Sequence, residues 1–178
     1  LYLKNETDFF TTKKKVLHMA PEQCFLNRFK NLEHEYITAD LFSPIADVKA
    51  DITNLPFEEN TFDIIFCNHV LEHIQDDTQA MKELYRVMKN GGMGVFQVPQ
   101  DINRETTFED NSITDRKERA KIFGQYDHVR IYGLDYFDKL RATGFKVKEE
   151  KYCSNLPDKL IDQYRLMENE ILPVVFKN

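Results

Sequence analysis

Residues 62–99 decide the fold, and they read FDIIFCNHVLEHIQDDTQAMKELYRVMKNGGMGVFQVP. Phe62–Cys67 is an almost unbroken apolar run, as expected of a strand that is covered on both faces. From Asp76 to Lys89 apolar residues recur at helical spacing, and the Asn-Gly-Gly sequence that follows predicts the end of a helix. Met93–Val98 then predicts a second strand. A strand, a helix and a strand in this order are typical of a parallel sheet.

The same alternation continues on both sides of this unit. It predicts further strands at Lys15–Met19, Glu35–Ala39, Asp47–Ala50, Phe145–Tyr152 and Ile171–Phe176. It also predicts a helix that starts at Pro21, and helices over Leu134–Thr143 and Asp158–Glu168. Pro173 predicts an edge or bulge position for the last strand, and the polar residues 101–115 predict a loop or lid. We therefore expect an α/β three-layer sandwich with a doubly wound, mostly parallel seven-stranded sheet.

The composition is that of one globular domain. The chain has 178 residues, of which 42% are hydrophobic and 30% are charged. Its net charge of −6 argues against binding to nucleic acid or to an anionic membrane surface. No apolar run approaches the roughly 18 residues of a membrane span. We expect a single domain over residues 1–178 and, because the chain does not begin with Met, a preceding segment that this sequence lacks.

Cysteine and glycine usage exclude two common kinds of site. Cys24, Cys67 and Cys153 are far apart and odd in number, which predicts neither a disulfide framework nor a zinc ribbon. A reducing, cytoplasmic setting fits this pattern best. All six glycines lie at or beyond Gly91, so the first 90 residues contain no glycine-rich phosphate cradle.

Carboxylates follow two of the predicted strands. In a parallel α/β sheet, ligands bind beyond the carboxyl ends of the strands, near the point where the strand order reverses. Asp40 stands about twenty residues past the first strand, where a carboxylate can accept both hydroxyl protons of a ribose. Asp51 follows the next strand. The alternative for both residues is a local role as turn caps.

Four segments in this order resemble the class I S-adenosylmethionine-dependent methyltransferases, in particular the branch that methylates small molecules. They are VLHMAPE (16–22), ITADL (37–41), DITNLPFEENTFDIIFCNHVLEHI (51–74) and LYRVMKNGGMGVFQVP (84–99). The resemblance covers Lys15 to Phe145. It implies a Rossmann-like methyltransferase fold with an antiparallel last strand. It also implies methyl transfer from S-adenosylmethionine to an unidentified small molecule, with S-adenosylhomocysteine as the product.

The resemblance further implies which residues hold the cofactor. The turn under its methionine part would comprise His18, Met19, Ala20 and Pro21. Asp40 would bind the ribose hydroxyls and Leu41 would pack on the adenine. Asp51 would accept a hydrogen bond from the adenine amine, and the backbone of Ile52 would bind the neighbouring ring nitrogen. The methionine and sulfonium end would be lined by Asn68, His69 and Val70.

The first of these segments departs from the family pattern. The family has an acidic residue followed by Gly-x-Gly-x-Gly, whereas residues 18–24 read HMAPEQC. Ala20 is still small, and Pro21 pre-sets the entry into a helix. This departure opens a second hypothesis, in which the chain is a methyltransferase-like cofactor-binding module without transfer activity.

Residues 124–133, GQYDHVRIYG, match a variant subset of the family that also carries the L-H-x-A-P-E sequence. His128, with Asp127 and Arg130, is therefore the candidate catalytic residue, since an imidazole can take a proton from an acceptor near neutral pH. The alternative is that the DHVR sequence orients a polar loop through hydrogen bonds and salt bridges.

Residues 69–73, HVLEH, match the H-x-x-E-H pattern in which two histidines bind zinc and a glutamate is the base. That chemistry needs all three side chains on one helix, whereas this string begins at the end of a strand. A zinc hydrolase that uses His69, Glu72 and His73 is thus a third hypothesis, and we expect no metal. No residue pattern identifies the acceptor or an oligomeric state.

Overall fold

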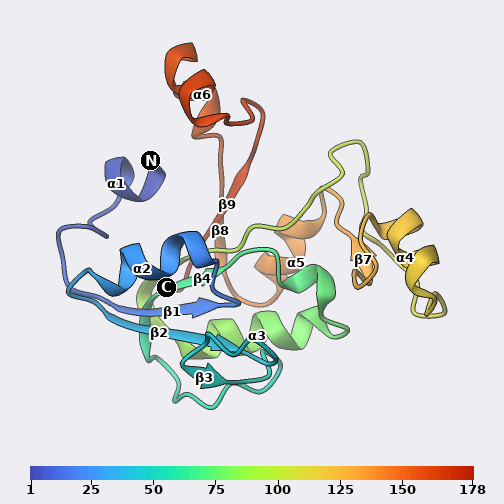
Figure 1. Ribbon diagram of the computed structural model, residues 1–178, viewed down its shortest axis with the longest axis horizontal. Coiled ribbons are helices and arrows are strands. Elements are labelled where there is room, and N and C mark those ends of the chain that lie inside the picture. Colours follow the sequence, from blue (N-terminus) through green and yellow to red (C-terminus); the bar gives the residue numbers. More distant parts are fainter.

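The computed structural model describes all 178 residues and is built on a seven-stranded sheet (Figure 1). The sheet has the strand order β3-β2-β1-β4-β5-β9-β8. The strands are β1 (Lys15–Met19), β2 (Glu35–Asp40), β3 (Val48–Lys49), β4 (Phe62–Cys67), β5 (Met88–Val95), β8 (Lys146–Glu150) and β9 (Leu172–Phe176). Strands β1 to β5 pair in parallel, whereas β9 is antiparallel to both β5 and β8. The predicted doubly wound sheet with an antiparallel last strand is confirmed.

Helices cover both faces of the sheet. The structure contains helices α1 (Tyr2–Glu6), α2 (Gln23–Lys30), α3 (Asp77–Val87), α4 (Arg116–Phe123), α5 (Tyr136–Ala142) and α6 (Asp158–Tyr164), with short 3-10 turns η1 (Leu71–His73) and η2 (Cys153–Asn155). Phe29 of α2 packs with Val16 and Phe66 on one face. On the other face, α3 and α5 pack over Leu17, Ile65 and neighbouring residues. These layers form the predicted three-layer sandwich.

Strand β4 lies at the centre of both apolar layers. Ile64 and Phe66 belong to the layer beneath α2, whereas Phe62, Ile65 and Cys67 belong to the layer beneath α3 and α5. All five are nearly or fully buried. Because side chains alternate along a strand, a strand that is covered on both faces is apolar at almost every position, which explains the FDIIFC run.

The edge position predicted from Pro173 is wrong. Strand β9 lies between β5 and β8, and Pro173 is paired with Glu149 of β8. The last β5–β9 pair joins Val95 and Val174, and the amide of Phe96 donates to the carbonyl of Pro173 at 3.1 Å. Pro173 has no N–H to donate back to the carbonyl of Phe96, and this carbonyl accepts instead from the hydroxyl of Tyr136 at 2.7 Å, so the proline leaves no unpaired acceptor here.

The boundary between α3 and β5 also differs from the prediction. The carboxylate of Asp76 caps the start of α3 by accepting a bond from the amide of Gln79 at 2.9 Å. The helix ends at Val87, and β5 begins at Met88, ahead of the Asn-Gly-Gly sequence. The register between β4 and β5 shifts here, and Gly91 has a φ of 78°. This glycine therefore serves a bulge inside the strand and not a helix stop.

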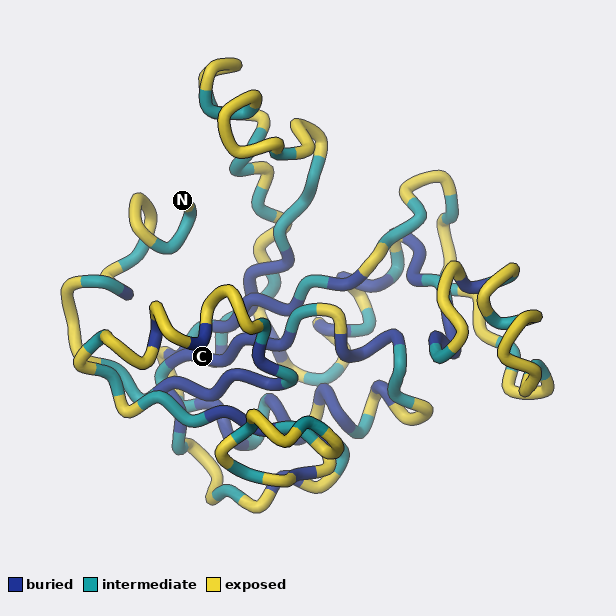
Figure 2. The backbone as a smooth tube through the Cα atoms, viewed as in Figure 1, coloured by how far each residue is buried: buried dark blue, intermediate teal, exposed yellow.

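Residues 101–131 form an extension beyond the sheet, seen at the right of Figure 1. It contains α4 and a two-stranded sheet of β6 (Phe108–Glu109) and β7 (Arg130–Ile131). The burial colours in Figure 2 show that α4 is mostly exposed, whereas the chain around β7 is buried where it returns to the main body. No helix in the structure is both long and apolar enough to span a membrane.

Candidate functional site

A cavity of about 420 Å³ lies at the carboxyl ends of β1, β2 and β4 and beside the residues that follow β3. The strand order reverses between β1 and β4, so this is where a doubly wound sheet binds its ligand. The cavity is lined by Met19, Ala20, Asp40, Leu41, Phe42, Ala50, Asp51, Ile52, His69, Val70, His73, Ile74 and Asp127. Most residues of the predicted cofactor site are therefore brought together.

The two strand-end carboxylates use one oxygen each to hold their own turns. Oδ1 of Asp40 accepts from the amides of Phe42 and Ser43, both at 2.6 Å. Oδ1 of Asp51 accepts from the amide of Thr53 at 2.8 Å and from its hydroxyl at 2.7 Å. Neither Oδ2 atom has a hydrogen-bond partner within the chain. The turn-capping alternative is thus correct for one oxygen of each residue, and the other oxygen remains available to a ligand.

Ala20 turns the chain at the end of β1 in a conformation that glycine normally adopts. Its φ is 45°, in the left-handed region, where a Cβ atom is strained. Its amide donates to the carbonyl of Ala39 at 2.9 Å, which continues the pairing of β1 with β2. The backbone geometry of a glycine-containing turn is therefore kept without a glycine. Pro21, also predicted for the site, is buried and does not line the cavity.

His18 faces the α2 layer and does not line the cavity. It is 1% exposed, its Nδ1 lies 2.6 Å from the hydroxyl of Tyr36, and its Nε2 is hydrogen-bonded to the carboxylate of Glu22. Asn68 also lies outside the cavity lining and donates to the same carboxylate at 3.2 Å. Burial alone would raise the pKa of Glu22, but the hydrogen bonds from His18 and its other partners lower it overall. His18 and Asn68 thus hold the turn after β1 against the end of β4.

His69 lies on the boundary between the first cavity, of about 420 Å³, and a second cavity. The second cavity, of about 640 Å³, lies past the end of β5 and is lined by His69, Gln97, Val98, Pro99, Gln100, Ile102, Leu134, Met167, Glu168, Asn169, Glu170 and Ile171. The amide of His69 donates to the carbonyl of Gln97 at 2.7 Å, and its φ is 54°. Its Nδ1 lies 3.6 Å from the carboxylate of Glu72, and this contact raises the pKa of His69.

The DHVR sequence is held against η1 by Arg130. This guanidinium is 3% exposed and donates at 2.9 Å each to the carbonyls of Leu71 and Gln75 and to the carboxylate of Glu109. His128 is 8% exposed, and its Nδ1 lies 3.1 Å from the carbonyl of Phe123. It does not line either cavity, whereas Asp127 lines the first. The bonds of Arg130 agree with the alternative in which the DHVR sequence orients the loop.

Five residues of the cavity lining were not predicted for the cofactor site, namely Phe42, Ala50, His73, Ile74 and Asp127. Phe42 is 89% exposed, which is unusual for a phenylalanine and fits a surface that a flat ligand covers. Its position directly after Asp40 and Leu41 could have revealed it. His73 also lines the cavity, although it was considered only as part of the HVLEH string.

The strand order and the cavity at its reversal define the class I methyltransferase fold. Residues 9–96 match the family described as "Methyltransferase domain", so this part of the chain is a methyltransferase domain. Among solved structures, an S-adenosylmethionine-dependent methyltransferase from Mesorhizobium loti aligns with a TM-score of 0.61 at 15% identity, over 93% of this chain and 92% of that one. The 1,6-didemethyltoxoflavin-N1-methyltransferase of Burkholderia thailandensis, with bound S-adenosylhomocysteine, aligns with a TM-score of 0.61 at 14% identity, over 92% and 69%.

Two proteins with similar sequences illustrate how the chain compares with curated relatives. A 2-phytyl-1,4-naphtoquinone methyltransferase of Nostoc punctiforme is 43% identical over 116 residues, which are 58% of this chain and 50% of that protein. An uncharacterised protein of Methanocaldococcus jannaschii is 27% identical over 132 residues, which are 72% and 55% of the two chains. The chain spans about half the length of these curated relatives.

Proposed function

We propose that this chain binds S-adenosylmethionine in the 420 Å³ cavity and transfers its methyl group to a small molecule. The observation that carries the proposal is the pair of carboxylates, Asp40 and Asp51, that each present one unpartnered oxygen at the point where the strand order reverses. The bound S-adenosylhomocysteine of the Burkholderia enzyme and the quinone named for the Nostoc enzyme support the same reading.

In this proposal the cofactor lies across the strand ends. Oδ2 of Asp40 accepts from the ribose hydroxyls, and Asp51 accepts from the adenine amine next to the backbone of Ile52. Leu41 and the exposed ring of Phe42 cover the adenine. The turn at Met19 and Ala20 supports the methionine part, and the positively charged sulfonium lies near His69 and Val70.

The acceptor belongs in the second cavity. Methyl transfer is an in-line displacement, so the acceptor atom must approach the methyl group from the side opposite the sulfur, and catalysis depends mainly on positioning. The 640 Å³ cavity shares His69 with the cofactor cavity, which gives the two ligands a common boundary. Ile102, Leu134, Met167 and Ile171 give this cavity an apolar part, which suits an acceptor with an apolar body. We infer that His69 receives a proton from such an acceptor, which is supported by its position in the lining of both cavities, whereas His128 lines neither.

Isothermal titration calorimetry with S-adenosylhomocysteine tests cofactor binding. Asp40→Asn keeps an oxygen for the turn but removes the carboxylate, so we expect at least about tenfold weaker binding. Asp110→Asn is the matched control, because Asp110 caps a similar turn through Ser112, at 2.9 Å to the amide and 2.6 Å to the hydroxyl, and does not line the cavity. Absence of saturation at millimolar ligand, or equal effects of the two variants, would contradict the proposal.

A binding module without transfer activity is the second candidate function. It is favoured by Ala20, which holds the left-handed turn without the glycines of the family pattern. Incubation with methyl-labelled S-adenosylmethionine and a panel of reduced quinones separates the two candidates. Labelled product supports the enzyme, whereas tight S-adenosylhomocysteine binding with no product from any acceptor supports the module.

A further inference from the structure

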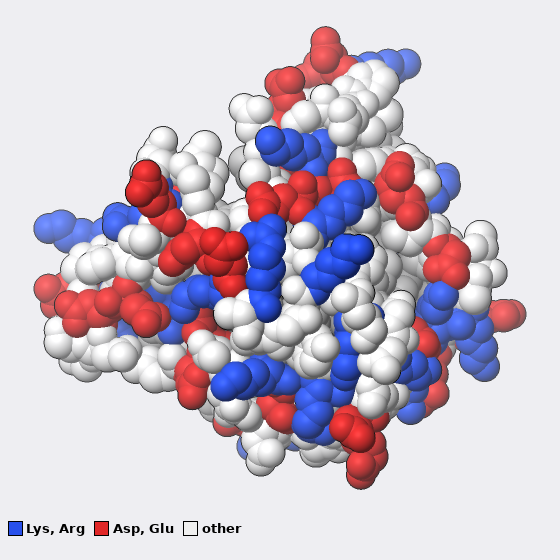
Figure 3. All heavy atoms as spheres, turned by 180° about the vertical axis from the view of Figure 1, so that it is seen from behind, with Lys and Arg blue, Asp and Glu red and all other residues white.

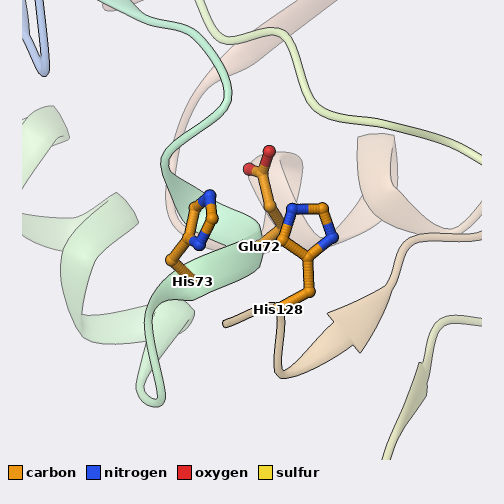
Figure 4. Close-up of side chains that lie close together, drawn as sticks. All are labelled: Glu72, His73 and His128. Carbon is orange, nitrogen blue, oxygen red and sulfur yellow. The ribbon is translucent and has the colours of Figure 1, made fainter. Parts of the chain in front are cut away.

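Glu72, His73 and His128 converge beside the cofactor cavity, although His128 is far from the other two in sequence (Figure 4). One carboxylate oxygen of Glu72 and one ring nitrogen of each histidine lie within 4.8 Å of one another. The two imidazole rings meet edge to face with their centroids 4.7 Å apart. From this cluster we infer that the protein binds a divalent transition-metal ion through Glu72, His73 and His128.

The carboxylate of Glu72 is buried with too few partners. It is 2% exposed, and its Oε2 has no hydrogen-bond partner. Its Oε1 has only the long 3.6 Å contact with His69. A buried carboxylate without hydrogen bonds or a counter-charge carries a large desolvation cost. A cation bound at Glu72 would offset this cost, which a purely structural glutamate leaves uncompensated.

Both histidines are oriented as metal ligands usually are. Nδ1 of His128 lies 3.1 Å from the carbonyl of Phe123, which can only accept, so Nδ1 carries the proton and Nε2 carries the lone pair. Nδ1 of His73 lies 3.5 Å from the carboxylate of Asp127, which favours the same tautomer. A ligating histidine typically donates its other ring N–H to a carboxylate or a backbone carbonyl.

The fold fixes the relative position of the three residues. Glu72 and His73 lie in η1, and His128 lies two residues before the start of β7. The amide of Val129, next to His128, donates to the carbonyl of Glu72 at 2.9 Å. Arg130 adds its bonds to the carbonyls of Leu71 and Gln75 on either side of the two η1 ligands. These contacts hold the His128 segment on η1 through the backbone, without any metal.

The donor set defines the class of ion. Two imidazole nitrogens and one carboxylate oxygen suit Zn²⁺, Fe²⁺, Co²⁺ or Mn²⁺, whereas Mg²⁺ and Ca²⁺ prefer oxygen ligands alone. Ligand atoms on one tetrahedral ion lie about 3.3 Å apart. The three ligand atoms now lie within 4.8 Å of one another, so their side chains must move closer together when the ion binds. Three protein ligands leave a position open, and His73 places the site on the wall of the cofactor cavity.

This cluster differs from the one expected for a zinc hydrolase. The HVLEH pattern needs His69, but His69 precedes η1, has a φ of 54° and lies outside the cluster. His128 takes its place, and Glu72 is a ligand and not a free base. Metal binding at this cluster does not require methyl transfer, because only the three side chains and their partners form the site.

The test is a metal titration of the full chain after removal of bound ions with a chelator. We expect one Zn²⁺ or Co²⁺ per chain, and a Co²⁺ complex with visible bands of a four- or five-coordinate site but no thiolate charge-transfer band. Glu72→Gln and His128→Gln should each weaken binding by more than about 100-fold, and Asp127→Asn by about 10- to 100-fold. His34→Gln is the matched control and should bind as the unmodified chain does, because His34 accepts from the amide of Lys14 at 3.2 Å, packs on Phe9 and lies outside the cluster.

Several results would overturn the inference. They are no saturable binding by the unmodified chain, binding that survives His128→Gln, loss of binding in His34→Gln, or a thiolate band that assigns the ion to a cysteine. Circular dichroism of each variant checks its folding. If a ligand variant fails to fold, the titration and Co²⁺ spectrum of the unmodified chain still decide, because they need no substitution.

Discussion

At the scale of single residues, the strand-end positions were predictable and the direction of some side chains was not. Asp40 is the last residue of β2 and Asp51 lies two residues past β3, so both line the cavity at strand ends that the apolar patterns located. His18 was predicted to line the turn under the cofactor, but it lies within β1 two residues after Val16, so its side chain points to the α2 layer as that of Val16 does. Its partners Tyr36 and Glu22 come from other segments. The pairing with Tyr36, which lies 18 residues away in β2, leaves no mark in the local sequence.

Ala20→Gly should stabilise the protein, contrary to the usual effect of glycine. An L-residue with a φ of 45° is strained by about 1 kcal/mol, and glycine relieves that strain. We expect the free energy of unfolding, measured with urea, to rise by up to about 1 kcal/mol. Ala39→Gly in β2 is the control and should lower it. A loss of stability in Ala20→Gly as large as in the control would show that position 20 is unstrained.

At the scale of elements, the long and strongly patterned segments were predictable. β1 and β4 have the predicted bounds, because each is a short apolar run between polar residues. The strands β6 and β7 were not predicted, since each has only two residues and forms through contact with a distant segment. The cluster of Glu72, His73 and His128 was missed for the same reason, because it exists only once β7 has docked on η1.

Arg130→Lys should destabilise this docking. A lysine ammonium cannot reach the carbonyls of Leu71 and Gln75 and the carboxylate of Glu109 together, so at least one buried acceptor loses its partner. We expect a loss of about 2 kcal/mol in the free energy of unfolding.

The matched control is Arg141→Lys. Arg141 also bonds two acidic side chains, Asp138 at 2.7 Å and Glu149 at 2.6 Å, but it is 42% exposed. Exposed ion pairs contribute little, so this variant should change stability by less than about 0.5 kcal/mol. If both substitutions change the free energy of unfolding in urea by the same small amount, Arg130 does not hold β7 on η1.

At the scale of the whole molecule, the sheet order creates two adjoining cavities at one end of the strands. The first was predictable from the strand-end residues. The second was not, because it needs Met167 to Ile171, which reach the end of β5 only when β9 inserts between β5 and β8. The face seen in Figure 3 carries acidic and basic side chains interspersed, which agrees with a small-molecule acceptor better than with nucleic acid.

The most direct test of the cofactor site is a titration of ¹⁵N-labelled protein with S-adenosylhomocysteine, followed by amide NMR. We expect saturable shifts at Ala20, at Asp40 to Phe42, at Asp51 and Ile52, and at His69 and Val70. Amides around the cavity of about 530 Å³ between α1, α2 and α6 should not change. Shifts confined to that other cavity, or no shifts at saturating ligand, would contradict the assignment of a cofactor site to the strand ends.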